Sequence, residues 1–198
     1  MRTETDLPER ARALLDFWFG PPGDPGRERR REIWFRSTPE FDAAVHHHLL
    51  ADHEAAAAGA LGTWEETPES ALALVILLDQ VPRNIFRGSP RAYTSDPLAR
   101  AITDRALARG FDRMLPPAWR MFFYLPFEHS EDIADQRRAV ALFGTLPSDP
   151  ARPDSMRKVW RHYEIVERFG RFPHRNAILG RVSTPEELVF LTEPDSSF

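Results

Sequence analysis

Three of the seven histidines lie where an imidazole could serve as an acid–base group. His129 precedes Ile133 by four residues, so it lies at the start of an apolar helical stripe. His162 lies on the apolar face of its segment, and His174 sits just inside a short helix opened by a proline. Such a histidine is either a hydrogen-bonded core residue or part of a functional site. With the nearby Glu131, these three histidines are the candidate acid–base residues.

Two similar turns add candidate ligand-binding groups. Each turn has a proline, an Arg-Asn pair, apolar residues and a closing glycine, at residues 82–88 and 173–180. Free amide groups and a guanidinium at the start of a helical turn favour an anion or a carbonyl group. The alternative is two independent helix caps. The candidate ligand-binding residues in and around these turns are Asp79, Arg83, Asn84, Arg87, Arg171, Arg175 and Asn176.

Asp79 has its own alternative. It follows Ile76 by three residues, on what we expect to be the buried face of an apolar helix. A buried carboxylate requires a partner, and Arg83, one turn further along, could form a bidentate pair with it. Asp79 is therefore either half of a structural ion pair that fixes this turn or a ligand-binding group.

Metal binding is a weaker hypothesis. The chain has no cysteine, and no two potential ligands have a dedicated metal spacing. The residues that could form a divalent site are His129, His162 and either Glu131 or Asp132. We therefore expect neither a structural metal nor a cofactor. The remaining histidines are expected to be exposed on a polar helix, and they are His46, His47, His48 and His53.

Composition limits the function classes. The net charge of −4 over 198 residues gives no overall nucleic-acid or anionic-membrane signature. No apolar run approaches the roughly 20 residues of a membrane helix, and the charged first residues do not resemble a signal peptide. The absence of cysteine suits a reducing compartment. We expect a cytoplasmic protein with no nucleic-acid or membrane partner.

The periodicity is helical throughout, with no convincing strand pattern. A Thr-Pro-Glu sequence opens three expected helices, with Thr38, Thr67 and Thr184 as N-caps. Ser130 and the Asp96-Pro97 pair are expected to open two others. Helices are predicted over residues 7–18, 39–60, 68–80, 97–109, 117–124, 131–143, 155–169, 173–179 and 185–191.

The expected organisation is one helical domain over residues 1–198, with a surface loop at 19–31 and a C-terminal tail at 192–198. No linker is long enough to divide the chain. The segment 69–78 is apolar on all sides, so we expect it to be the central helix. Short connections between the other helices favour antiparallel neighbours.

Long motifs carry a family resemblance. They read LDFWFG at 15–20, LDQVPRNIFRG at 78–88, LPFEHSED at 125–132 and RFGRFPHRN at 168–176, and a further match covers 179–187. The chain thereby resembles the bacterial domain-of-unknown-function family numbered 924. This resemblance implies an all-α, tetratricopeptide-like array, here of about eight or nine antiparallel helices. It implies no known reaction, substrate or cofactor.

Two functional hypotheses remain. In the first, the candidate residues form a polar pocket for a small anionic or amide-bearing ligand, with histidine acid–base chemistry if the protein is an enzyme. Arg83, His129, His162 and His174 would then surround one cavity. In the second, the helical array is a scaffold that binds a peptide or a protein. The fold class cannot decide between them.

Overall fold

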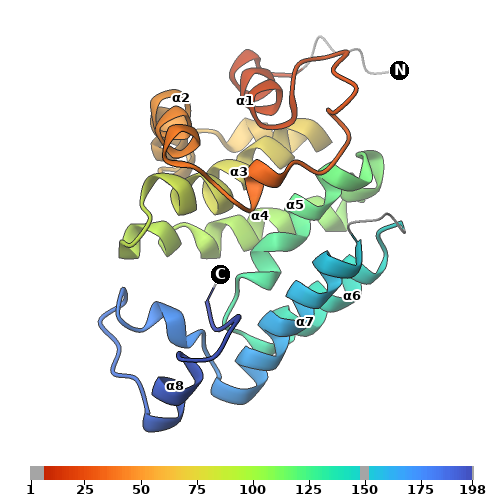
Figure 1. Ribbon diagram of the computed structural model, residues 1–198. Coiled ribbons are helices and arrows are strands. Elements are labelled where there is room, and N and C mark those ends of the chain that lie inside the picture. The colour runs from red at the N-terminus through yellow and green to blue at the C-terminus, as the bar shows by residue number, and fades with distance from the viewer. Residues whose placement is uncertain (1–6, 148–151, 198) are drawn as a thin grey trace. The chain divides into compact units, whose positions relative to one another are not determined.

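The computed structural model describes residues 7–147 and 152–197, and within these ranges every regular element is a helix (Figure 1). The predicted all-α fold is confirmed. The α-helices are α1 (Glu9–Phe19), α2 (Pro39–Ala57), α3 (Pro68–Ile85), α4 (Asp96–Ala108), α5 (Pro117–Glu128), α6 (Ile133–Gly144), α7 (Arg152–Phe169) and α8 (Pro185–Phe190). Short 3₁₀ helices are η2 (Glu32–Trp34), η3 (Gly62–Glu66), η4 (Pro90–Tyr93), η5 (Phe111–Met114) and η6 (Pro173–Arg175).

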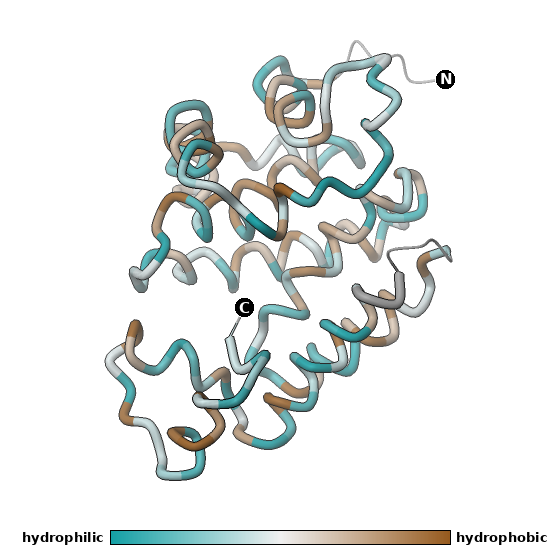
Figure 2. The backbone as a smooth tube through the Cα atoms, viewed as in Figure 1, coloured by the Kyte–Doolittle hydropathy of each residue, from teal (hydrophilic) through white to brown (hydrophobic). Residues whose placement is uncertain are grey.

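The chain forms two compact units, each described by itself below. The N-terminal unit contains the residues up to Arg87 and Arg91–Pro126, and the C-terminal unit contains Gly88–Pro90 and the residues from Phe127 onward. The expectation of a single domain stays a prediction. In both units hydrophobic and hydrophilic residues follow one another along the helices (Figure 2).

Helix α3 is the centre of the N-terminal unit. All its side chains from Ser70 to Pro82 are buried, and α1, α2 and α4 pack against it (Figure 1). This confirms the central helix that the apolar segment predicted. The helix continues to Ile85, beyond its expected end at residue 80. Pro82 cannot donate to the carbonyl of Leu78, but the Ser95 hydroxyl donates to that oxygen at 2.6 Å. A side chain thus replaces the missing backbone donor.

Helices α6 and α7 lie side by side in the C-terminal unit (Figure 1). The core of this unit includes Ile165, Val166, Phe172 and Phe190, all at most 2% exposed. The expected helix over 173–179 is only the short η6, followed by turns. Its polar side chains bond to neighbouring segments, as described below, and the Arg181 amide closes a turn onto the Asn176 carbonyl at 2.8 Å.

The three threonine N-caps are confirmed. The hydroxyl of Thr38 accepts from the amide of Phe41, Thr67 accepts from the amide of Ser70, and Thr184 forms a full capping box. Two other expected helix starts differ from the observed ones by one or two residues. Helix α4 begins at Asp96, whose carboxylate binds Arg83, and its N-cap residue Ser95 forms no cap bond because its hydroxyl donates to the Leu78 carbonyl. Helix α6 is capped by Asp132. The hydroxyl of Ser130, two residues earlier, accepts from the amide of Asp132.

His53 also differs from its prediction. It is 6% exposed, and its Nδ1 lies 2.8 Å from the carbonyl oxygen of Leu77. A carbonyl only accepts, so Nδ1 carries the proton. Burial lowers the pKa of His53. His46, His47 and His48 are exposed, as predicted. No helix in the described part of the chain is both long and apolar enough to cross a membrane.

Candidate functional site

The predicted site residues fall into two groups. Asp79, Arg83, Asn84 and Arg87 belong to the N-terminal unit. The others belong to the C-terminal unit, and they are His129, Glu131, His162, Arg171, His174, Arg175 and Asn176. That Arg83 shares one cavity with the histidines stays a prediction. Each group therefore lies within one unit, and its contacts are those of that unit.

The Arg83 guanidinium in the N-terminal unit lies between two carboxylates. It forms two parallel hydrogen bonds to Asp96, at 2.9 and 3.0 Å, and its Nη1 lies 3.3 Å from Asp79 Oδ1. Gln80 donates to the other oxygen of Asp79 at 2.7 Å. Burial alone would lower the pKa of Arg83, but the charges of Asp79 and Asp96 outweigh it and raise the pKa. Asp79 therefore forms an ion pair with Arg83 inside α3, but the bidentate partner of Arg83 is Asp96, and that pair ties α3 to the start of α4.

Asn84 and Arg87 hold the end of α3 against the start of α2. The Asn84 amide donates to Asp42 at 2.7 Å and to the Ser37 hydroxyl at 3.2 Å, and the Arg87 guanidinium binds both oxygens of Asp42. Partial burial would raise the pKa of Asp42. The Ser37 hydroxyl also donates to Asp42, at 2.6 Å. The bonds from Ser37, Asn84 and Arg87 together outweigh the effect of burial and lower the pKa of Asp42. These polar groups bind one another across two helices.

Glu131 organises the segment after α7 in the C-terminal unit. Its carboxylate accepts the amide of Phe172 at 2.8 Å and a bidentate pair from Arg181 at 2.7 and 2.9 Å. Burial would raise the pKa of Glu131, but the Arg181 bonds and the Phe172 amide lower it. The Arg181 Nε also donates to Asn176 Oδ1 at 2.9 Å. Glu131, predicted as an acid–base group, is here an ionised carboxylate that anchors this segment.

Glu187 is a second anchor. It accepts two bonds from Arg171, at 2.6 and 2.7 Å, the amide of Thr184 at 2.7 Å and the Asn176 amide at 3.2 Å. The Arg171 bonds are the main cause that lowers the pKa of Glu187 to about 2. Sequence reasoning missed Glu187 and Arg181. The capping-box position of Glu187, three residues after Thr184, was a usable signal for it.

The three predicted histidines lie in one group, in which Phe172 contacts His162 and His174, and His162 contacts His129. The rings of His129 and His162 are 6.4 Å apart between centroids, and the Phe172 ring lies 5.4 Å from His162 and 5.7 Å from His174. His162 is buried, whereas His129 and His174 are partly exposed. Segments from the end of α5, from α7 and from η6 are therefore brought together. We call Glu128, His129, His162, Phe172 and His174 the histidine cluster.

Glu128 and His162 form a buried pair within the histidine cluster. The Nδ1 of His162 lies 3.2 Å from Glu128 Oε1 and 2.9 Å from the Lys158 carbonyl oxygen. Both partners accept, so Nδ1 carries the proton and Nε2 keeps its lone pair. Glu128 is 5% exposed and His162 is 6% exposed. Sequence reasoning missed Glu128, although it directly precedes His129 and follows buried Tyr124 by one helical turn.

Desolvation keeps two of these imidazoles neutral at pH 7. Burial lowers the pKa of His162 well below its usual range, despite the bond to the Lys158 carbonyl, and nearby His129 adds to the effect. Burial and the neighbouring charge of Arg175 lower the pKa of His174 to about 4. A neutral imidazole is both a donor and an acceptor, so these groups can bind a ligand without carrying charge.

The two remaining predicted groups, Arg175 and Asn176, are largely buried. Arg175 donates to the carbonyl of His129 at 3.0 Å, and its guanidinium lies 4.4 Å from the centre of the Phe172 ring. Asn176 links Arg181 to Glu187, as described above. Both residues hold the η6 segment, and Arg175 also borders the histidine cluster.

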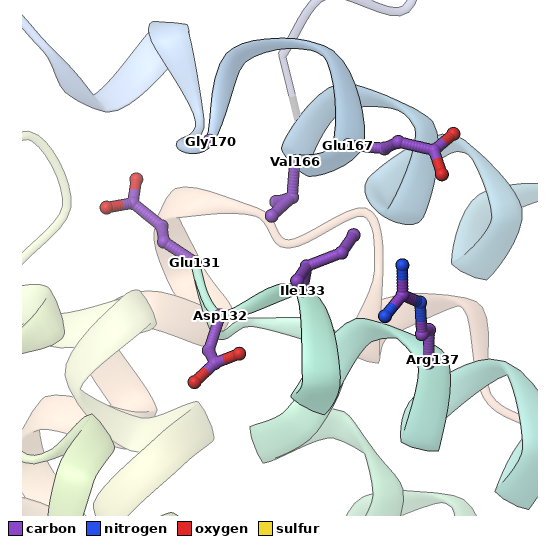
Figure 3. Close-up of a pocket in the computed structure, with 7 residues that line it drawn as sticks. All are labelled: Glu131, Asp132, Ile133, Arg137, Val166, Glu167 and Gly170. Atoms are coloured by element: carbon purple, nitrogen blue, oxygen red, sulfur yellow. The ribbon is translucent and has the colours of Figure 1, made fainter.

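A cavity of about 680 Å³ lies between the start of α6 and the end of α7 (Figure 3). Its lining mixes acids, one arginine and apolar side chains, and consists of Glu131, Asp132, Ile133, Arg137, Val166, Glu167 and Gly170. Two of its acids already have partners, because Glu131 binds Arg181 and Asp132 caps α6. No histidine lines it. Among the described residues, no three His, Asp or Glu side chains are grouped to hold a metal ion, which does not support the metal hypothesis.

The fold and these networks define an all-α protein whose polar motifs mostly bind one another. The family described as bacterial protein of unknown function (DUF924) matches residues 14–195, so the chain belongs to this family. A solved structure of a protein of unknown function from Agrobacterium tumefaciens is similar, with 44% identity and a TM-score of 0.82. The match covers 92% of this chain and 96% of that one. No curated protein gives a significant match.

Proposed function

We propose that the C-terminal unit binds a small ligand at the histidine cluster. The observation that carries this proposal is the buried pair of Glu128 and His162, with the partly exposed His129 and His174 beside it. Burying a carboxylate and an imidazole together is costly unless their interactions offset the lost hydration. Such clusters of desolvated titratable groups are concentrated at functional sites.

The ligand that fits this cluster best carries an amide or a similar neutral polar group. The arginines that favoured an anion are engaged by protein acceptors, since Arg83 binds Asp96, Arg171 binds Glu187 and Arg175 binds the His129 carbonyl. An amide has both a donor and an acceptor: the His162 Nε2 lone pair would accept from its N–H, and the neutral, partly exposed His174 could donate to its carbonyl. The buried Phe172 ring packs against both His162 and His174 and so fixes their relative positions.

The same pair suits acid–base chemistry. The Nε2 of His162 can accept a proton from a bound ligand, while Glu128 and the Lys158 carbonyl hold Nδ1–H and stabilise the resulting imidazolium. The low pKa of His162 makes it a weak base at rest, so proton transfer would be driven by a ligand that is itself acidic or becomes so during the reaction. Ligand binding is thus the first part of the proposal, and enzymatic activity is a second, more specific part.

A peptide- or protein-binding scaffold is the second candidate. It is favoured by apolar side chains that the C-terminal unit leaves in solvent around α8: Val182 is 88% exposed, Leu188 57% and Val189 65%. A partner with an apolar face could cover them. This surface and the histidine cluster use different residues, so variants separate the two functions.

The decisive experiment is a ligand screen read at the histidines. The imidazole Cε1–H signals would be followed by NMR during titration with asparagine, glutamine, nicotinamide and acetate. We expect an amide compound to move the signals of His129 and His174, and His129→Ala/His174→Ala to abolish binding. His46→Ala/His47→Ala, at exposed positions on α2, is the matched control and should bind normally. If acetate alone moved the signals, the anion hypothesis would replace the amide one.

Native mass spectrometry of the freshly purified protein complements the screen. A co-purified small molecule that is lost in His129→Ala/His174→Ala but kept in the α2 control would support the proposal. If no compound of the screen moved the cluster signals and no bound mass was found, ligand binding at this cluster would be refuted. The apolar surface of α8 would then become the leading candidate.

A further inference from the structure

The turn that follows α5 carries two residues of the histidine cluster. Helix α5 ends at Glu128, and His129 and Ser130 follow before Asp132 caps α6. The last carbonyls of any helix lack intrahelical partners, so their direction depends on what binds them. The direction of the Glu128 and His129 side chains depends in turn on that backbone.

One buried side chain binds the carbonyls on both sides of His129. The Nε2 of Gln136 donates to the carbonyl of Glu128 at 2.7 Å and to the carbonyl of Ser130 at 2.6 Å, and it lies 3.3 Å from the Phe127 carbonyl. Three surrounding carbonyl oxygens establish that this atom is the amide nitrogen. Its two hydrogens match the two short bonds.

Gln136 is directed entirely at this turn. It is 0% exposed, and within the described residues its Oε1 has no hydrogen-bond partner. An amide is rarely buried with half of its polar atoms unsatisfied, so the bonds of the other half must compensate. All of those bonds go to the turn that carries Glu128 and His129.

The carbonyl of His129 itself is bound from the other side. Arg175 donates to it at 3.0 Å, so the carbonyls of residues 128, 129 and 130 are each held by a side-chain donor. Two of the three depend on Gln136. The backbone that presents Glu128 to His162 is therefore fixed by groups outside the histidine cluster.

We infer that Gln136 is a positioning residue of the histidine cluster: by binding the carbonyls of Glu128 and Ser130, it sets the directions of the Glu128 and His129 side chains. This inference deepens the proposed function and rests on it for its purpose, although the geometry can be tested without any ligand. A purely structural amide would support the fold and leave the imidazoles unaffected. A positioning residue would change their electrostatic environment.

The test is an NMR pH titration of the histidines in Gln136→Met and Gln136→Glu. Methionine keeps the length of the side chain and removes the donors without adding charge, so it isolates positioning; glutamate keeps the shape but replaces the amide nitrogen with an oxygen that can carry charge, so its shift counts only where methionine gives one too. We expect the titration midpoints of His129 or His162 to move by about 0.5 unit or more, because the distance from Glu128 changes. The midpoint of His53, in the N-terminal unit, should stay unchanged.

Thr145→Ala is the matched control, since its hydroxyl donates to the Leu142 carbonyl at the far end of the same helix. It should lower the melting temperature and leave all histidine midpoints in place. Folded Gln136 variants with unchanged midpoints would overturn the inference. So would failure of both variants to fold, because Gln136 would then serve the fold and not the cluster. If the midpoints move but no screened compound binds, the positioning stands and the proposed function fails.

Discussion

At the scale of single residues, the polar motifs of this chain mostly satisfy one another. Arg83 binds Asp96, and Arg171 binds Glu187. In the C-terminal unit, Asn176 joins the network of Glu187 to that of Arg181. The histidine cluster is different, because burial lowers the pKa values of two of its members, His162 and His174. Its titration should therefore be visible in the stability of the protein.

Acid should destabilise the folded state through His174. Its pKa is about 4 when folded and about 6.5 when unfolded. Below pH 6.5 the unfolded chain binds a proton that the folded chain does not, so stability is present above that pH and is lost as the pH falls toward 4. Between pH 7 and pH 5 this histidine should account for about 2 kcal/mol of the loss.

Urea unfolding of the wild type and of His174→Gln at both pH values measures this contribution. Glutamine keeps a neutral polar side chain and cannot gain the charge, so the variant should lose less stability on acidification. Exposed His47→Gln is the control and should behave like the wild type. Equal losses in all three proteins would show that His174 is not desolvated in the folded state.

At the scale of elements, one hydroxyl allows α3 to continue through a proline. Ser95 donates to the Leu78 carbonyl that Pro82 leaves without a donor. Ser95→Ala should cost about 1–3 kcal/mol, since a buried acceptor then lacks its partner. In a Pro82→Ala background the backbone amide of residue 82 can donate to Leu78, so the same serine change should cost less.

A double-mutant cycle measured by urea unfolding gives the coupling between residues 82 and 95 directly. Equal costs for Ser95→Ala in both backgrounds would mean that the hydroxyl does not substitute for the missing backbone bond. The helix would then continue through Pro82 for packing reasons alone.

At the scale of the whole molecule, the expectation of one domain can be tested by cooperativity. A single domain loses its structure in one transition that all probes report together. His53 reports on the N-terminal unit and His162 on the C-terminal unit. We expect their NMR signals to disappear at the same urea concentration. Separate midpoints would show that the two units are independent domains.

Chelation should leave the melting temperature of the purified protein unchanged, because a structural metal would otherwise stabilise the folded state by mass action. The measurement is a thermal melt with and without excess EDTA. A large drop that a single divalent ion reverses would bring back the metal hypothesis for His129, His162 and the neighbouring acids.

Features that depend on neighbours a few residues apart could be predicted from the amino-acid sequence. Thr67 caps α3 because its hydroxyl reaches an amide three residues on, and α3 is central because every side of it is apolar. The inward position of His162 follows from the same helical spacing, whereas His129 lies partly exposed in the turn after α5. These are local properties, so the periodic pattern of residues is enough to predict them.

The partners of the polar groups, in contrast, depend on how distant segments pack in the folded protein. Arg83 meets Asp96 across 13 residues, Gln136 meets the turn at Glu128, and Arg181 meets Glu131 across 50 residues. His53 lies on a polar-looking helix, yet packing against α3 buries it at the Leu77 carbonyl. Hydrogen bonds act over about 3 Å, whereas helical periodicity specifies only a face, so which donor reaches which acceptor is set by how the helices pack.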